Sequence, residues 1–150
     1  MVDESIVSQV GLDGIESVAP LFDEYRRFYK QTSDLPGARL FLQDRVSKNE
    51  SVVFVARLNR KPVGFTQLYP SFSSVRMKKI WILNDLFVLP EVRKQGVATT
   101  LINAAVSLAR ETGAHHLVLS TAKVNPAQKL YRHYGWKLDD EFDQFYFDLV

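Results

Sequence analysis

Residues 79–120 constrain the fold more than any other part of the chain, because an amphipathic helix stands there between two apolar strands. The run from Lys79 to Val88 is nearly continuous in apolar residues, as is typical of a strand buried on both faces. A helical stripe of apolar residues follows from Gly96 to Thr112, and then a second buried strand from His116 to Ser120. This order predicts two parallel strands joined by a right-handed crossover.

The remaining segments alternate between strand and helix patterns. We expect a strand at 5–10, helices at 15–29 and 40–48 separated by breakers at 33–37, a hairpin of strands at 51–58 and 62–69, a short helix at 126–134 and a last strand at 142–149. No linker or composition break divides the chain, so residues 1–150 are expected to form one domain of the α/β (α+β) class. We expect a central mixed, mostly antiparallel twisted sheet flanked by helices.

The composition is that of an ordinary globular protein, with 46% apolar and 24% charged residues in a chain of 150. The absence of cysteine removes thiol nucleophiles, disulfides and Cys-ligated zinc from consideration. With a net charge of +2, the chain lacks the broad basic surface that nucleic-acid binders usually have. The sequence shows no signal peptide and no run of the ~18 to 20 apolar residues that a membrane helix needs. We therefore expect a cytoplasmic protein that binds neither nucleic acid nor membrane.

A basic turn at Arg93–Ala98 lies where the strand passes into the helix. Unpaired backbone amides and the positive end of the helix dipole favour an anion there, and Gly96 lets a phosphate approach the backbone closely. Neither a GxGxxG pattern nor a glycine-rich loop ending in Gly-Lys-Ser/Thr is present, which argues against a classical Rossmann or nucleoside-triphosphate site. A tight turn with solvated cations is an equally simple interpretation of the turn taken alone.

Two short motifs are spaced as they are in one known family. RKQGVA at Arg93–Ala98 matches the signature R/Q-x-x-G-x-G/A, and AQKLYRHYGW at Ala127–Trp136 matches the segment A-x-x-x-Y-x-x-x-G-F/W. Both resemble the GNAT superfamily of acetyl-CoA dependent N-acetyltransferases, which implies a GNAT-like fold. The YRRFY segment at Tyr25–Tyr29 and the strand LNDLFV look like the spermidine/spermine acetyltransferase-type and yeast Hpa-type branches of that superfamily.

The resemblance implies that acetyl-CoA is the co-substrate. One strand would pair through its backbone with the pantetheine arm, and the basic turn would hold the pyrophosphate, in agreement with the anion site inferred above. The cofactor-binding residues implied in this way are Leu86, Phe87, Val88, Arg93, Lys94, Gln95, Gly96, Val97, Ala98 and Thr99. Asn125 is added to them, although it lies six residues before Tyr131 where the family usually has seven.

Tyr131 falls at the position of the family's general acid, which donates a proton to the departing CoA thiolate. The alternative is a core aromatic, because Tyr131 shares a helical face with Leu130 and Tyr134.

Asp85 is the second candidate catalytic residue, since a carboxylate within a strongly apolar strand needs a reason and burial would raise its pKa. It would help to deprotonate the acceptor ammonium, directly or through water. The alternative is a structural carboxylate bonded to nearby backbone or to a tyrosine. Strand alternation sends Asn84 and Asp85 to opposite faces, so that only one of them is expected to point into the site.

The acceptor side is predicted from aromatic and acidic residues. Tyr25 and Tyr29 on the first helix, with Asn84, are the candidate substrate-binding residues. Acidic residues crowd the segment before the last strand, namely Asp139, Asp140, Glu141 and Asp143. Together these features suggest a cleft for a small cationic amine, polyamine-like, lysine-like or amino-acid-like, or for a basic peptide. A solvated acidic loop is the alternative.

The sequence thus predicts an N-acetyltransferase that moves the acetyl group from acetyl-CoA to a primary amine. Direct attack in a ternary complex is expected, because the chain has no cysteine to carry the acetyl group. The alternatives are transfer of a different acyl group and a catalytically idle CoA-binding or interaction module. The histidines lack metal-ligand spacing, so no metal is expected, and we expect a homodimer.

Overall fold

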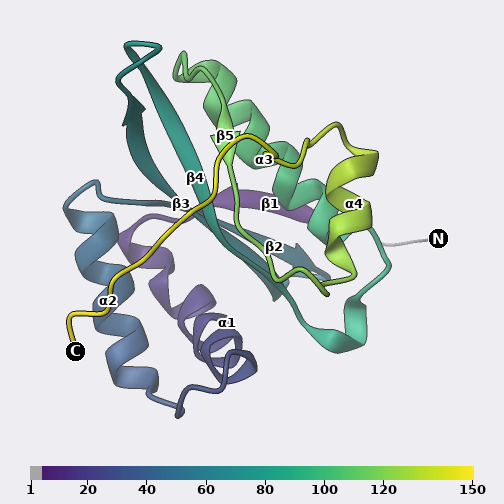
Figure 1. The fold of residues 1–150 in the computed structure, drawn as a ribbon. Helices are drawn as coiled ribbons and strands as arrows, with labels where there is room; N and C mark the ends of the chain where they lie inside the picture. The colour runs from purple at the N-terminus through teal and green to yellow at the C-terminus, as the bar shows by residue number, and fades with distance from the viewer. Residues whose placement is uncertain (1–4) are drawn as a thin grey trace. The chain divides into compact units, whose positions relative to one another are not determined.

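The computed structural model of the protein describes residues 5–150. These residues gather into two compact units, one ending at Leu119 and the other running from Ser120 to Val150, and we describe each unit by itself. Figure 1 labels the helices and strands of both units. No helix in the described part of the chain is both long and apolar enough to cross a membrane.

The first unit is built on one five-stranded sheet in the order β1-β2-β3-β4-β5. The strands are β1 (Ile6–Gln9), β2 (Val52–Leu58), β3 (Lys61–Ser73), β4 (Lys78–Val88) and β5 (Leu117–Val118). The first three pairs of neighbours are antiparallel and the pair β4 and β5 is parallel. The prediction of a mixed, mostly antiparallel sheet is therefore confirmed.

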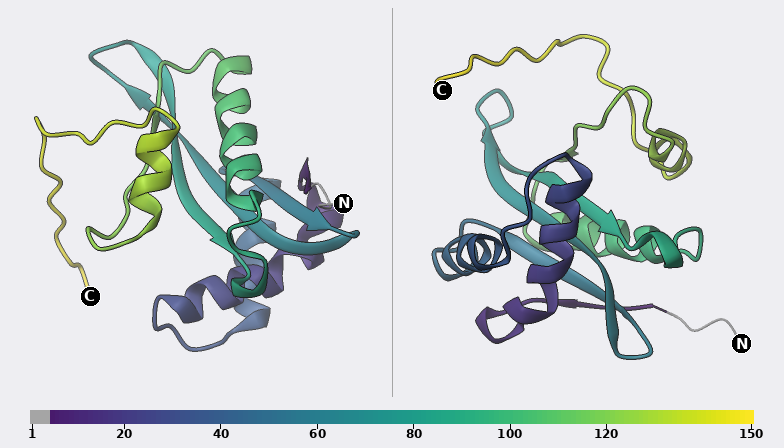
Figure 2. Two further views of the ribbon diagram at one scale, coloured as in Figure 1. Left: turned by 90° about the vertical axis from the view of Figure 1, so that its right-hand side faces the viewer. Right: turned by 90° about the horizontal axis from the view of Figure 1, so that it is seen from below.

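Helices cover both faces of this sheet (Figures 1 and 2). Helices α1 (Ile15–Phe28) and α2 (Leu35–Ser47) lie together on one face, and α3 (Val97–Glu111) lies on the other. Short 3₁₀ turns, η1 (Leu12–Gly14) and η2 (Pro90–Val92), precede α1 and α3. Because α3 connects β4 to its parallel neighbour β5, the predicted crossover is confirmed.

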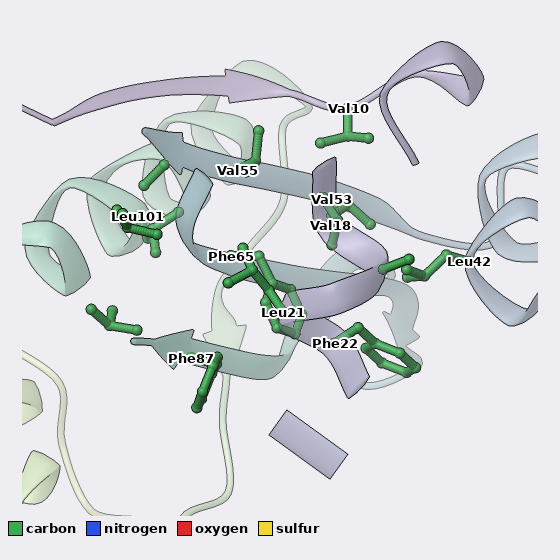
Figure 3. Close-up of a cluster of buried hydrophobic side chains, with 14 of the residues drawn as sticks. Val10, Val18, Leu21, Phe22, Leu42, Val53, Val55, Phe65, Phe87 and Leu101 are labelled. Atoms are coloured by element: carbon green, nitrogen blue, oxygen red, sulfur yellow. The ribbon is translucent and has the colours of Figure 1, made fainter. Parts of the chain in front are cut away.

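The core on the side of α1 and α2 is built around the ring of Phe65 in β3, which is fully buried. Its ring centroid lies 6.0 Å from that of Phe22, 5.7 Å from that of Tyr25 and 6.4 Å from that of Phe87. Figure 3 shows Phe65 between the strands and the α1 side chains Leu21 and Phe22. These aromatic contacts fix the position of α1 against β3 and β4.

Helix α2 begins earlier than its apolar pattern indicates. The Asp34 side chain accepts a hydrogen bond from the Gly37 amide at 3.0 Å and so caps the helix, while Pro36 lies in the first turn. A first-turn proline loses no helical hydrogen bond, because the first amides of a helix have no acceptor within it. The prediction that Pro36 and Gly37 separate the two helices is therefore wrong, and both belong to α2.

The last two predicted strands also differ from the structure. The expected strand at 116–120 is reduced to the two residues of β5, and residues 142–149 form no strand. The second unit contains α4 (Ala127–His133) as its helix, with Gly135 at φ 91° just beyond it, as predicted for a glycine that ends a helix. An alternating pattern becomes a strand only where a neighbouring strand takes up its backbone groups, and this unit offers no such strand.

Candidate active site

A β-bulge in β4 sets the geometry of the site. Gln67 of β3 is opposite Asp85, but the next residue, Leu68, is opposite Leu83, so that Asn84 is an extra residue in β4. Directly opposed residues of an antiparallel pair point to the same face, and neighbours along a strand point to opposite faces. The bulge therefore places the side chains of Leu83 and Asp85 on opposite faces of the sheet.

The contacts on each side agree with this assignment. Before the bulge, the Trp81 Nε1 atom donates to Thr112 Oγ1 at the end of α3, at 2.8 Å. After the bulge, the ring of Phe87 lies 6.3 Å from that of Tyr25 in α1. Asp85 therefore shares the α1 face with Phe87. Without the extra residue, it would be on the α3 side.

Asp85 is 3% exposed and is surrounded by hydrogen-bond donors. The Gln67 Nε2 atom donates to its Oδ2 at 2.6 Å, the Asn84 Nδ2 atom donates to its Oδ1 at 2.9 Å, and the Tyr25 hydroxyl is a further partner. Burial raises the pKa of Asp85 above its ordinary value, and these hydrogen bonds oppose that rise without cancelling it. The expectation that Asn84 and Asp85 diverge is wrong, because the bulge interrupts the strand alternation.

Tyrosines line the surroundings of this carboxylate. Burial, and then the negative charge of Asp85, raise the pKa of Tyr25 far above its ordinary value. The same two causes raise the pKa of Tyr69 in β3 to about 12. Tyr29 is half exposed at the end of α1, with its ring 5.1 Å from that of Tyr25 in an edge-to-face contact. Two of the three predicted substrate-binding residues, Tyr25 and Asn84, thus touch Asp85, and Tyr29 continues the aromatic surface outward.

Sequence reasoning missed Gln67, which is fully buried and supplies the shortest of these hydrogen bonds. Its Oε1 atom is buried with no hydrogen-bond partner in the described part of the chain. The signal was available, since Gln67 is a polar residue in an apolar strand, as Asp85 is. What the sequence lacked was the register that brings the two strands' polar residues together.

The outer edge of β4 is open beside this site. β5 pairs with Trp81 and Ile82 only, and beyond them no strand of residues 5–150 joins that edge. The segment Leu86–Val88, predicted to pair with the pantetheine arm, lies in this open part. An unpaired strand edge presents backbone groups that an extended ligand can bind as an added strand.

The turn before α3 has the backbone of an anion site. Lys94 and Gly96 adopt positive φ values of 62° and 83°, and no side chain caps the helix. The first amides of a helix have no acceptor within it, and a Cβ atom built on Gly96 would meet no atom within 4 Å. The turn is exposed at Lys94, Gln95 and Gly96. It is followed by the first amides of α3, those of Val97, Ala98 and Thr99, and this arrangement suits a pyrophosphate.

Arg93 connects this turn to the aromatic residues on the α1 side. Its Nε atom donates to the Val88 carbonyl oxygen at 3.0 Å. Its guanidinium carbon lies 6.0 Å from the ring centroid of Phe28 and 5.9 Å from that of Phe87. The side chain is therefore held over aromatic rings at the end of β4, and it also occupies the carbonyl of one predicted pantetheine-binding residue.

In the second unit, Tyr131 lies on α4 with its ring centroid 6.0 Å from that of Trp136. The Asn125 side chain donates to Thr121 Oγ1 at 2.9 Å and accepts from the Ala127 amide at 3.0 Å. Asn125 thus holds the start of α4 in place, and both ends of its amide are engaged. The Asp139 side chain accepts hydrogen bonds from the amides of Glu141 and Phe142 in an exposed turn. In residues 5–150, no three His, Asp or Glu side chains converge to hold a metal ion.

Comparison with known proteins identifies the family of this chain. The model of the acetyltransferase (GNAT) family matches residues 18–136. The chain belongs to the GNAT acetyltransferase family. It is an enzyme of the acetyltransferase class, and the fold of this family uses acetyl-CoA. The superfamily predicted from the two motifs is thereby confirmed.

Relatives of this GNAT acetyltransferase match over most of its length. The uncharacterised N-acetyltransferase YhfO of Bacillus subtilis is 46% identical over 137 residues, covering 91% of this chain and 92% of the relative. A probable acetyltransferase of Haemophilus influenzae is 32% identical over 130 residues, covering 78% and 89%. The crystal structure of a probable acetyltransferase has a TM-score of 0.91 at 40% identity and covers 97% of this chain and 98% of its own.

Proposed function

We propose that this GNAT enzyme transfers the acetyl group of acetyl-CoA to a primary amine by direct attack in a ternary complex. The observation that carries the proposal is the buried Asp85 carboxylate, which lies on the α1 side of β4 in the part of the strand whose outer edge is open. The open strand edge, which suits an extended thioester, thus directly follows a carboxylate of raised pKa in the sequence.

Asp85 is the proposed general base, acting directly or through a water molecule. An amine attacks a thioester only in its neutral form, so the acceptor ammonium must first lose a proton. A carboxylate with a raised pKa holds that proton better than an ordinary aspartate does. Gln67 and Asn84 are positioning residues here, because their amides hold the two carboxylate oxygens.

The groups proposed to hold acetyl-CoA are those found at the open edge and at the turn. The backbone of Leu86–Val88 aligns the pantetheine arm, and the amides that follow Arg93 bind the pyrophosphate. Acetyl-CoA supplies the activated acetyl thioester. Tyr131 is the proposed proton donor to the departing thiolate, and Asn125 remains a proposed cofactor contact.

A small cationic amine is the proposed acceptor. Tyr25 and Tyr29 offer aromatic faces beside a carboxylate, which suits an ammonium group. One relative, 24% identical over 106 residues and covering 67% of this chain, is the thialysine N-epsilon-acetyltransferase of Caenorhabditis elegans. Its name supports an acceptor whose reacting amine stands at the end of a side chain.

Three measurements test the proposal. Acetyl-CoA should raise the melting temperature of the purified protein, and thiol release should follow when polyamines, aminoglycosides, amino acids or basic peptides are added. Asp85→Asn should lower kcat by about 10²-fold or more with little change in the acetyl-CoA affinity. Stabilisation by acetyl-CoA without thiol release on any amine would favour the idle binding module, and release from another acyl-CoA alone would favour a different acyl group.

The homodimer and the cytoplasmic location are further parts of the proposal. Three exposed apolar side chains, Phe72, Val75 and Met77, stand on and beside the loop joining β3 to β4, where a second copy could cover them. Light scattering coupled to size-exclusion chromatography tests the dimer. A mass equal to one chain at micromolar concentration would refute it.

A further inference from the structure

Arg45 of α2 extends the Asp85 site at the end away from the basic turn. Its guanidinium carbon lies 4.8 Å from the ring centroid of Phe41. Its Nη2 atom forms an ion pair with Glu50 Oε1 at 3.6 Å, a distance longer than a hydrogen bond, and the Glu50 side chain is half exposed. Its Nε atom is buried without a hydrogen-bond partner in the described part of the chain. Arg45 thus has a half-exposed ion-pair partner and one buried donor, Nε, that no described residue accepts from.

A continuous row of rings connects Arg45 to Asp85. The Phe41 ring stacks on Phe22, with centroids 5.7 Å apart and an interplanar angle of 8°. The Phe22 ring lies 6.3 Å from that of Tyr25, whose hydroxyl bonds to Asp85. Arg45 and Asp85 therefore stand at opposite ends of a row of aromatic rings on the same face of the sheet, in which Phe22 is buried and Phe41 is partly exposed.

Tyr69 is influenced by both of these charges. It follows Gln67 by two residues in β3 and so points to the same face as Gln67. The charge of Asp85 raises the pKa of Tyr69 and the charge of Arg45 lowers it, which shows that both groups are close enough to act on one hydroxyl. A hydroxyl there can donate to or accept from a ligand that spans the two charges.

We propose that Arg45 binds the carboxylate of the acceptor, and that the acceptor is an amino acid whose side-chain amine reacts at Asp85. The inference rests on the proposed amine acetylation. A guanidinium matches a carboxylate through paired N–H groups, and in an amino acid this carboxylate offsets the charge of the neighbouring α-ammonium. The second ammonium of a diamine has no such partner and would be repelled by the guanidinium. The row of rings separates the two charges, so the carboxylate and the reacting amine are joined by an alkyl chain and not by a single carbon. The apolar rings pack against that chain.

The test compares acceptors that differ only in the carboxylate. L-Lysine, its decarboxylated analogue 1,5-diaminopentane and lysinamide all carry the same terminal amine. Wild-type enzyme should show a kcat/KM for lysine at least about 10-fold above that for either analogue. This comparison needs no variant, so it stands even where a substitution disturbs folding.

Substitution of Arg45 then tests whether this residue causes the preference for lysine. Arg45→Gln should reduce the ratio of kcat/KM for lysine over 1,5-diaminopentane to about one, through a higher KM for lysine. Arg45→Lys should restore part of the ratio, since it keeps the charge but loses the paired geometry. Arg110→Gln, which removes an exposed cation at the end of α3, is the matched control and should leave the ratio unchanged.

The outcomes separate this inference from the function on which it rests. Three results would overturn the role of Arg45 and leave the acetyltransferase function standing. Amines are acetylated with no preference for lysine, 1,5-diaminopentane and lysinamide are preferred, or the preference for lysine survives in Arg45→Gln. Binding of acetyl-CoA with no amine acetylated overturns both.

Discussion

Leu83 and Asp85 lie on opposite faces of the sheet although a single residue separates them in β4. In a regular strand, these two side chains would share a face. Asn84 is the extra residue that reverses the alternation, and its amide then donates to the carboxylate that the bulge has turned toward α1. One inserted residue thus both aims the candidate base and supplies one of its hydrogen bonds.

Removal of a donor to Asp85 should change the pH dependence of the enzyme. Asp85 acts as a base only when ionised, so kcat/KM should fall as the pH drops through its pKa. The Gln67 hydrogen bond lowers that pKa, so Gln67→Met should move the acidic limb of the kcat/KM profile to higher pH. Gln43→Met on the exposed side of α2 is the control. An acidic limb at the same pH in wild type and Gln67→Met would contradict a role for Asp85 in the proton transfer.

Tyr131→Phe keeps the ring and removes the hydroxyl. As the proposed proton donor, Tyr131 should contribute to kcat and hardly to cofactor binding, so kcat should fall about 10- to 10³-fold while the Kd for acetyl-CoA changes little. Tyr134→Phe on the same short helix provides a matched control. Steady-state thiol release measures kcat in both variants, and stopped-flow binding measures the Kd for acetyl-CoA. Wild-type turnover in Tyr131→Phe would remove this tyrosine from the mechanism.

Two glycines with similar left-handed backbone conformations test the anion site. Gly96 and Gly113 have φ values of 83° and 69°, and an added Cβ meets no atom within 4 Å at either. Valine at either position should therefore cost a similar amount of stability. Only Gly96→Val should weaken acetyl-CoA binding measured by calorimetry, because its side chain would stand where the pyrophosphate approaches. Equal affinities in the two variants would show that the turn is structural.

Arg93→Ala tests the side chain beside that turn. Loss of a charge-assisted contact to the pyrophosphate should weaken acetyl-CoA binding by about 1.5 to 3 kcal/mol in the same calorimetric titration. Arg110→Ala serves as the control for the loss of one positive charge. An unchanged affinity for Arg93→Ala would limit the role of Arg93 to its contacts with Val88 and the two phenylalanines.

Asp23 should make the stability of the protein depend on pH in the acidic range. Its carboxylate accepts from Ser33 Oγ at 2.6 Å and from the Asp34 amide at 2.7 Å, and the Ser33 hydrogen bond is the largest cause of its lowered pKa. A carboxyl with a lowered folded pKa stabilises the fold above its ordinary pKa and loses that contribution as the pH falls through the folded value. Asp23→Asn should therefore lower the free energy of unfolding by about 1 kcal/mol at pH 7, and the difference should shrink on acidification.

Urea unfolding at several pH values measures that difference. Asp148→Asn, an exposed change near the end of the chain, provides the baseline. A destabilisation by Asp23→Asn that stays constant down to pH 2 would show that the hydrogen-bond geometry matters and the charge does not.

Local signals were enough to predict the elements that carry the proposed site. The start of α3, the Gly96 turn and the polar Asp85 within an apolar strand are all legible in short windows, because helix ends, tight turns and buried strands depend on neighbouring residues. Asp34 and Pro36 show the limit of such reading, since the same residues can end one helix or begin the next.

Tertiary structure decided which of these residues meet. The register of β3 on β4 creates the bulge at Asn84 and brings Gln67 to Asp85, and the packing of α2 on α1 brings Arg45 to the same face. Residues 142–149 have the alternation of a strand but no strand partner within their own unit. Strand pairing and helix packing join residues far apart in the chain, and no local pattern specifies how those distant residues are aligned.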